Sequence, residues 1–387
     1  MSEMHGKIIR WVLAGGAFVA VLVTAGCAST KQSPSALNIA APTESSMGDD
    51  VKAPAEIQPV STANTGNKPQ IINIFGEFDG LQRNPGRPAG DGGFQQHTFV
   101  DEGFDSDVNL DPTGKWMVFT STRHSEHPNV YLQRVDGTSV IQLTNDEADY
   151  AYPTISPDGK QIAFCSTRGG NWDIYIMDME GKNVVQVTTG PMQHIHPSFS
   201  PDGNRLVYSS LGGKSDQWEL WTVDLATNEK RMIGFGLFPT WSPSKDVDRI
   251  AFQRARQRGS RWFSVWTLEL VGGEARRITE VSVSSNAAIV SPTWSPDGKR
   301  LAFATIAEPS DATAVKPVGQ QDIWMVEGDG SNRRRLTDGV GTNLSPCWAA
   351  DNRIFFVSDR TGTECIWSVA IDSEAKPSKV AVGSASE

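Results

Sequence analysis

The chain has 387 residues, of which 38% are hydrophobic and 21% charged, and its formal net charge is −10. The acidic balance argues against a general nucleic-acid-binding protein, whose affinity comes from basic contacts to phosphate. Four cysteines are too few for a disulfide-stabilised scaffold of this size. The abundance of Gly (36), Pro (22) and Trp (12) favours an all-β chain with many turns.

The N-terminus has the pattern of a secretory signal peptide. After a short basic start, an apolar run extends from Trp11 to Thr24, which is too short to span a bilayer. Small residues then precede Cys27, and this sequence resembles a bacterial lipobox, although Thr24 stands where Leu is usual. The resemblance implies cleavage after residue 26, lipid attachment at the Cys27 thiol and, because Ala28 follows, sorting to the outer membrane. Ordinary signal cleavage and an uncleaved anchor are the alternatives.

The segment after the signal peptide is predicted to be a tether. Residues 28–70 contain no aromatic residue, and Ala, Ser, Thr, Pro and Asn dominate their composition. Such a segment buries too little apolar surface to offset the entropy of ordering. We therefore divide the chain into a lipoprotein signal peptide (1–26), a lipidated, flexible and disordered tether (27–95) and a folded domain (96–387).

The folded domain consists of one repeat that occurs six times. A turn of the type Ser-Pro-Asp-Gly recurs at intervals of 42 to 54 residues, and this pattern favours a type I turn. Each turn precedes a strand-like run, and a second and mostly a third run follow. With the strand before the turn, each unit has four strands at the spacing of a propeller blade. The second residues of the six turns are Pro112, Pro157, Pro201, Pro243, Pro296 and, in a degenerate copy, Ala350.

The repeat resembles the WD40-like repeat of TolB-type propellers. In the second unit, the resemblance is carried by 156–160, 168–170, 173–175 and 186–188, which read SPDGK, RGG, DIY and QVT. Equivalent motifs recur through the folded domain. Because these propellers carry six such units, the resemblance implies an all-β fold, a six-bladed β-propeller with four antiparallel strands per blade.

The same resemblance implies a role in the cell envelope. It favours a non-enzymatic protein-binding scaffold, anchored by lipid to the outer membrane and facing the periplasm. The family contacts the peptidoglycan-associated lipoprotein through the propeller, so that protein is a candidate partner. The residues before the propeller have tether composition, whereas the family has an α/β domain there that is tied to TolA, so the TolA partnership is not implied. We expect a monomer with no nucleic-acid partner.

Two segments compete to close the ring in the last blade. Shifting the second unit back by 45 residues lays 142–147 on 97–102. This alignment predicts that residues 97–100 form the outer strand of the last blade. The alternative is a C-terminal strand at 379–382.

Charged and histidine residues gather in loops that are predicted to share one face, which we call the top face. These loops enter the first strand of each blade or join its second and third strands. Blades 1 and 2 are acidic there, blade 4 is basic, and a His-x-His sequence lies between them. Separated charge of this kind favours orientation-specific docking. The residues predicted to bind a ligand or partner are Asp105, Asp107, Asp149, His194, His196, Arg254, Arg256 and Arg258.

His194 and His196 are also the candidate metal ligands. Alternate residues of a strand point to the same side, so the two imidazoles could ligate one divalent cation. Because spacing fixes no third ligand, no resident cofactor is expected. The competing function is a propeller enzyme of the lyase or lactonase type, with a divalent cation at the channel mouth. The sequence has neither a nucleophile elbow nor a phosphate loop, which favours the scaffold.

Three cysteines of the folded domain are predicted to be free and largely buried. Cys347 and Cys365 fall on the first and third strands of the last blade. Two strands that flank a third lie roughly 9–10 Å apart, which is too far for a disulfide. Cys165 falls on the second strand of blade 2.

Overall fold

The computed structural model describes most of the predicted propeller and little of what precedes it. Its described residues contain β-strands and no helix, and hence none that is long and apolar enough to cross a membrane. The predicted signal peptide, Cys27 and nearly all of the predicted tether lie outside these residues. The described ranges are 93–211, 217–255, 263–284, 287–307 and 320–371.

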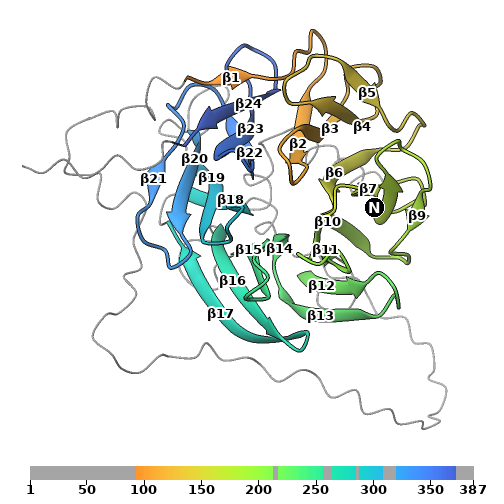
Figure 1. Cartoon of the computed structure of the whole chain (residues 1–387), viewed down its shortest axis with the longest axis vertical. Helices are drawn as coiled ribbons and strands as arrows, with labels where there is room; N and C mark the ends of the chain where they lie inside the picture. The colour runs from red at the N-terminus through yellow and green to blue at the C-terminus, as the bar shows by residue number, and fades with distance from the viewer. Residues whose placement is uncertain (1–92, 212–216, 256–262, 285–286, 308–319, 372–387) are drawn as a thin grey trace, which may run out of the picture.

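Six four-stranded antiparallel sheets stand radially around a central axis as the blades of a propeller (Figure 1). The inner strand of each blade contacts the inner strands of both neighbouring blades, so the ring is closed. The predicted all-β, six-bladed architecture is thus confirmed. Blades 1, 2 and 3 contain β2 (Asp105–Leu110), β3 (Trp116–Ser121), β4 (Asn129–Arg134), β5 (Val140–Gln142); β6 (Tyr150–Ile155), β7 (Gln161–Ser166), β8 (Asp173–Asp178), β9 (Val185–Gln186); and β10 (Gln193–Phe199), β11 (Arg205–Leu211), β12 (Trp218–Asp224), β13 (Lys230–Phe235).

The last three blades follow the same order from the inner to the outer strand, except that blade 6 takes its outer strand from the N-terminal side of the chain. Blades 4, 5 and 6 contain β14 (Leu237–Trp241), β15 (Arg249–Ala255), β16 (Phe263–Val271), β17 (Glu274–Ser282); β18 (Ala287–Trp294), β19 (Arg300–Ala307), β20 (Gln321–Glu327), β21 (Arg334–Arg335); and β22 (Asn343–Trp348), β23 (Arg353–Ser358), β24 (Cys365–Ala370), β1 (Gln95–Gln96).

The repeated turn links the inner strand of a blade to its second strand. In blade 2, the Gly159 amide donates to the Ser156 carbonyl at 2.9 Å. Gly159 has a φ of 71°, a conformation that favours glycine at the fourth turn position. The Ser156 hydroxyl donates to Asp158 at 2.7 Å and accepts the amide of Gln161 at 3.0 Å. The turn sequence therefore fixes both the reversal and the start of the next strand.

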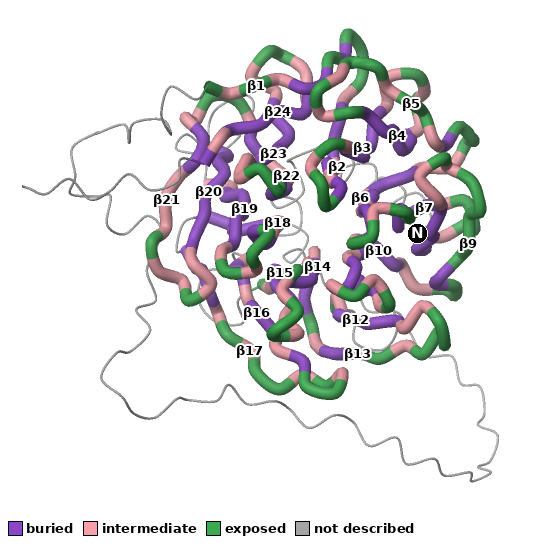
Figure 2. The backbone as a smooth tube through the Cα atoms, viewed as in Figure 1, coloured by how far each residue is buried: buried purple, intermediate pink, exposed green. Residues whose placement is uncertain are grey.

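The hydrophobic core lies between neighbouring blades. One cluster joins Phe119 and Tyr131 of blade 1 to Phe355 and Ile366 of blade 6, and all four are fully buried. Figure 2 shows buried residues concentrated on the inner and middle strands, with exposed residues along the outer edges. Each buried side chain of this size contributes about 1.5–3 kcal/mol to stability. Adjacent blades therefore stabilise each other, which makes ring closure important.

The three described cysteines are free and buried, as predicted. Cys347 lies on β22 and Cys365 on β24, and β23 separates them in the sheet. Cys165 lies on β7, the second strand of blade 2.

The N-terminal strand β1 closes the ring by pairing with β24. The predicted N-terminal closure is confirmed, but the strand lies at Gln95–Gln96 and not at residues 97–100. The rival segment 379–382 lies outside the described residues. The His97 imidazole contacts the Ser368 hydroxyl of β24 at 2.7 Å, and the His97 carbonyl accepts a hydrogen bond from Gln133 of blade 1 at 2.8 Å. The closing segment therefore fastens blade 6 to blade 1.

A buried threonine explains the shifted register. The Thr98 hydroxyl accepts the amide of Ile366 at 2.9 Å. In blade 1, the Thr144 hydroxyl accepts the amide of Val130 in the same way, at 3.0 Å. These equivalent threonines are 46 residues apart, so the 45-residue shift used to align the repeats was one residue short.

We predict that Thr98→Val will destabilise the protein by about 1–3 kcal/mol, because it leaves the buried Ile366 amide without an acceptor. The matched control is Thr279→Val, at an exposed position on β17. Urea denaturation of both variants is the measurement. Equal midpoints for Thr98→Val and the control would contradict this account of ring closure.

Candidate functional site

Every inner strand contains a shift of register at its centre, a β-bulge. One residue at each shift has a φ between 50° and 57°, in the left-handed region that non-glycine residues seldom adopt. In five of the six bulges a proline follows this residue. We call the six residues the bulge ring: they are Asp107, Tyr152, His196, Phe238, Ser291 and Ser345.

The bulge ring surrounds a cavity of about 100 Å³. The cavity is lined by the ring residues and by the two residues that follow each of them. Tyr152, His196 and Phe238 form an aromatic cluster with ring centroids 4.7–5.7 Å apart, whereas blades 5 and 6 contribute serines. Among the residues that the structure describes, Asp107 is the only charged one in the lining. The site is therefore aromatic on one side, small and polar on the other, and negative.

The bulge also separates the two predicted metal ligands. Because the register shifts between Ile195 and Ser198, the alternation of side chains along β10 is broken. His196 lines the cavity, whereas His194 is buried with its Nδ1 atom 2.8 Å from Asp173. We expected both imidazoles on one side because side chains alternate along a regular strand. β10 is not regular at the bulge, so that expectation does not apply there.

The described residues contain no group of three or more His, Cys, Asp or Glu side chains that could hold a metal ion. Asp107 and His196 are the only members of these residue types in the lining apart from Cys347. The predicted pair of His194 and His196 therefore does not form a common donor set.

Burial shifts the ionisation of the groups near the cavity. It raises the pKa of Asp107 to about 6. Burial, together with the nearby carboxylates of Asp359 and Asp107, raises the pKa of Glu364, in the β23–β24 loop, to about 7. Burial lowers the pKa of His196 to about 4, so this imidazole is neutral at pH 7. The charge of the site at neutral pH is therefore negative.

Neighbouring carboxylates on the top face are paired with other side chains of the protein. Asp105 is fully buried, and both of its oxygens accept hydrogen bonds from Arg123 within 2.9 Å. Asp149 lies 2.8 Å from Nδ1 of His127, and this pair is partly exposed. Two predicted site residues, Asp105 and Asp149, are thus engaged within the protein.

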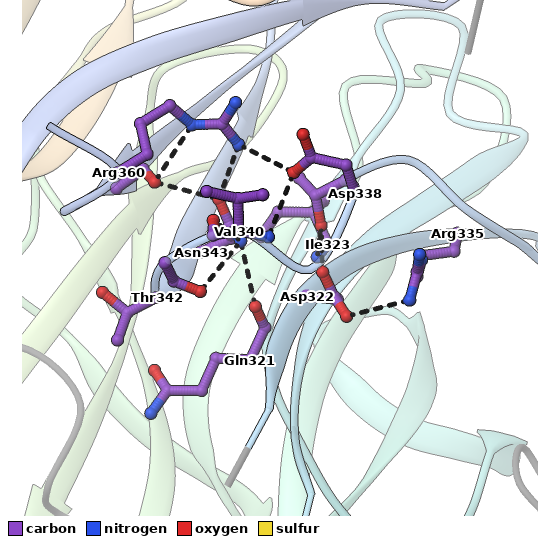
Figure 3. A network of polar contacts seen from close by, with 12 residues as sticks. Gln321, Asp322, Ile323, Arg335, Asp338, Val340, Thr342, Asn343 and Arg360 are labelled. Atoms are coloured by element: carbon purple, nitrogen blue, oxygen red, sulfur yellow. Dashed lines mark hydrogen bonds and ion pairs between the residues drawn. The ribbon is translucent and has the colours of Figure 1, made fainter. Parts of the chain in front are cut away.

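Figure 3 shows the same arrangement where blades 5 and 6 meet. Arg360 donates to Asp338 at 3.3 Å and to the Asn343 side chain at 3.2 Å. Arg335 lies 3.5 Å from Asp322. By contrast, the described part of the chain provides no Lys or Arg that forms an ion pair with Asp107 or Glu364. Asp107 thus differs from Asp105, two residues before it on the same strand.

The predicted basic segment of blade 4 is described only in part. Arg254 is half-buried on β15, and its guanidinium carbon lies 6.0 Å from the ring centroid of Trp266. Burial lowers the pKa of Arg254. Arg256 and Arg258 lie outside the described residues.

Of the predicted residues that the structure describes, Asp107 and His196 line the cavity and the others do not. Sequence analysis did not single out the other four members of the bulge ring, or Glu364. The signal that finds the ring is its spacing, because each member lies five residues before the second residue of a repeated turn. No comparable signal in the sequence identifies Glu364, which comes near Asp107 from the β23–β24 loop.

The fold and the bulge ring define the class of this protein: it is a six-bladed β-propeller with a polarised axial cavity. A family model described as the TolB beta propeller domain matches residues 95–265, 171–311 and 237–386. The chain therefore belongs to the TolB β-propeller family.

Individual relatives match over shorter segments. The Tol-Pal system protein TolB of Bordetella pertussis is 28% identical over 145 residues, covering 28% of this chain and 33% of that protein. An uncharacterised protein of Agrobacterium fabrum is 35% identical over 83 residues, covering 21% of this chain and 25% of its own length. The matches thus span a quarter to a third of these relatives. A structure described as TolB from Agrobacterium tumefaciens has a TM-score of 0.50 at 20% identity, covering 70% of this chain and 91% of that one, and shows a common fold.

We predict that Asp107→Asn will raise stability at pH 8. A carboxyl with a raised pKa in the folded state binds its proton more tightly there than in the unfolded state. Stability is therefore lost as the pH rises from about 4 to 6, and it stays lower above that window. Removing the charge should recover about 1–3 kcal/mol at pH 8 and progressively less as the pH falls towards 4.

The matched control is Asp105→Asn, on the same strand. This substitution leaves the buried Arg123 without its counter-charge and should destabilise the protein by about 3–5 kcal/mol at pH 8. Urea unfolding of both variants at pH 8 and at pH 4.5 is the measurement. Destabilisation by Asp107→Asn at pH 8 would contradict the assignment of an unpaired, desolvated carboxylate.

Proposed function

We propose that this protein is an envelope lipoprotein whose propeller acts in the periplasm as a non-enzymatic scaffold for another envelope protein. The observation that carries the proposal is the bulge ring. Its six residues share one backbone geometry but differ in chemistry, and they face one cavity. A rigid frame that varies mainly in the side chains it displays is suited to selective recognition.

The polar groups of the cavity also favour binding over catalysis. Among the described lining residues, no serine, threonine or cysteine side chain is hydrogen-bonded to a histidine or a carboxylate, as an activated nucleophile would be. His194 is not among the residues that line the cavity, so a divalent cation bound there could use only His196 of the predicted pair. No observation therefore favours the lyase- or lactonase-type alternative.

Membership of the TolB β-propeller family supports a partner in the envelope. The relatives include proteins described as Tol-Pal system protein TolB. A peptidoglycan-associated lipoprotein is accordingly the first partner to test. Lipidation at Cys27 would anchor the propeller to the outer membrane through the tether at 27–95.

In-cell photo-crosslinking tests the partner. A photoreactive amino acid at Ser345 faces the cavity, whereas the matched control at Val185 lies exposed on the outer strand β9. We expect Ser345 to capture a defined envelope protein, identified by mass spectrometry, and Val185 not to capture it. Capture at Val185 alone, or at neither position at native expression, would contradict the scaffold proposal.

Metabolic labelling with a fatty acid tests the anchor. Because the thiol of Cys27 is the proposed attachment site, Cys27→Ala should abolish incorporation of the label and move the protein from the membrane to the soluble fraction. The matched control is Cys165→Ala, at a buried thiol on β7. Label retained in Cys27→Ala would rule out this attachment site.

A further inference from the structure

Polar groups of the bulge ring are only partly paired within the described protein. The Asp107 carboxylate accepts long hydrogen bonds from the Ser106 hydroxyl at 3.3 Å and the Tyr152 amide at 3.4 Å, and the Thr120 side chain also interacts with it. The Nδ1 atom of His196 is buried without a hydrogen-bond partner in the described structure. Because buried polar groups are ordinarily paired, the ring presents binding capacity that the described protein does not use.

The charge of the cavity selects a cation. Asp107 is the only charged residue among the described residues of the lining, and Glu364 and Asp359 add negative potential nearby. His196 is neutral at pH 7 because burial lowers its pKa to about 4, so it neither neutralises Asp107 nor repels a cation. An unpaired carboxylate in a desolvated cavity is costly, and a positive group brought in by a ligand offsets that cost.

The aromatic cluster favours an organic cation over a metal ion. The Phe238 ring meets the rings of Tyr152 and His196 edge to face, at interplanar angles of 88° and 68°. Aromatic faces attract ammonium and guanidinium groups within about 6 Å of the ring centroid. A hard divalent cation instead requires several oxygen ligands, and the described residues contain no group of three or more candidate ligands.

The volume of the cavity limits what can enter. About 100 Å³ is less than the roughly 150 Å³ of an engineered cavity that binds benzene. The cavity therefore admits one side chain rather than a folded element. Blades 5 and 6 contribute serines to the bulge ring. The side of the cavity away from the aromatic cluster is therefore lined by small residues.

We propose that the bulge ring binds a single basic side chain of a protein partner, the ammonium of a lysine or the guanidinium of an arginine. Asp107 supplies the counter-charge, and Tyr152 and Phe238 contact the alkyl stem and the cationic head. This inference rests on the proposed scaffold function and adds the chemistry that the partner must present.

Small probes of defined charge test the site on the full chain. Nα-acetyl-lysine amide and Nα-acetyl-arginine amide are titrated into the protein at pH 7.5, and binding is followed by saturation-transfer NMR. Nα-acetyl-glutamine amide is the neutral probe. We expect the two cationic probes to bind at least tenfold more tightly than the neutral one. Equal binding of the three probes, or no binding at tens of millimolar, would overturn the inference.

Variants assign the binding to the ring. Asp107→Asn should weaken binding of the cationic probes at least tenfold, and Phe238→Leu should weaken it three- to tenfold without changing charge. The matched control Asp146→Asn removes a carboxylate that is already paired with Arg168 and should leave probe binding unchanged. Probe binding that survives Asp107→Asn would overturn the assignment.

A third titration separates organic from inorganic cations. Mn²⁺ is added to the same protein without the probes. Tight Mn²⁺ binding that is lost in Asp107→Asn, with no binding of the organic probes, would overturn the proposal in favour of a metal site. If the probes fail while crosslinking from Ser345 still captures an envelope protein, this inference fails and the scaffold function stands. If crosslinking from Ser345 captures no envelope protein, the scaffold function is contradicted.

Discussion

The bulge in each inner strand is the constraint on which the functional geometry depends. It interrupts the pleat at one level of all six strands and holds a non-glycine residue in the left-handed region. Such conformations are costly and persist where the surrounding structure over-determines them. Here the repeated turn, the ladder to the second strand and the contacts between blades hold each bulge in place. The result is a ring of six side chains around one cavity whose identities are set blade by blade.

The fold was largely predictable from the sequence because its turns and strand-like runs repeat. Type I turn chemistry and strand spacing together specify four strands per blade, and the short turns leave little freedom in their order. Ring closure was predicted on the correct side of the chain, but the strand lies at Gln95–Gln96 and not at 97–100, and the repeat alignment was one residue short. The deciding contact is the hydroxyl of Thr98 on the Ile366 amide, a long-range hydrogen bond that no local pattern reveals.

The site was less predictable, because strand alternation fails at the bulge. A regular strand would place His194 and His196 on one side, whereas the bulge sends one towards Asp173 and the other into the cavity. Charge composition marked an acidic region but could not distinguish paired from unpaired carboxylates. Arg123 forms an ion pair with Asp105 and none with Asp107, which lies two residues further along the same strand. That difference arises from tertiary placement, and it concentrates unbalanced negative charge at the cavity.

The central claim is that the propeller recognises its partner at the bulge ring. Hydrogen–deuterium exchange of the full chain, with and without the captured envelope protein, tests it most directly. We expect added protection at the inner strands around Tyr152, His196 and Phe238, with the outer strands β5 and β9 unchanged. Protection confined to the outer strands would contradict it, because the partner would then bind the rim of the propeller and not its axis.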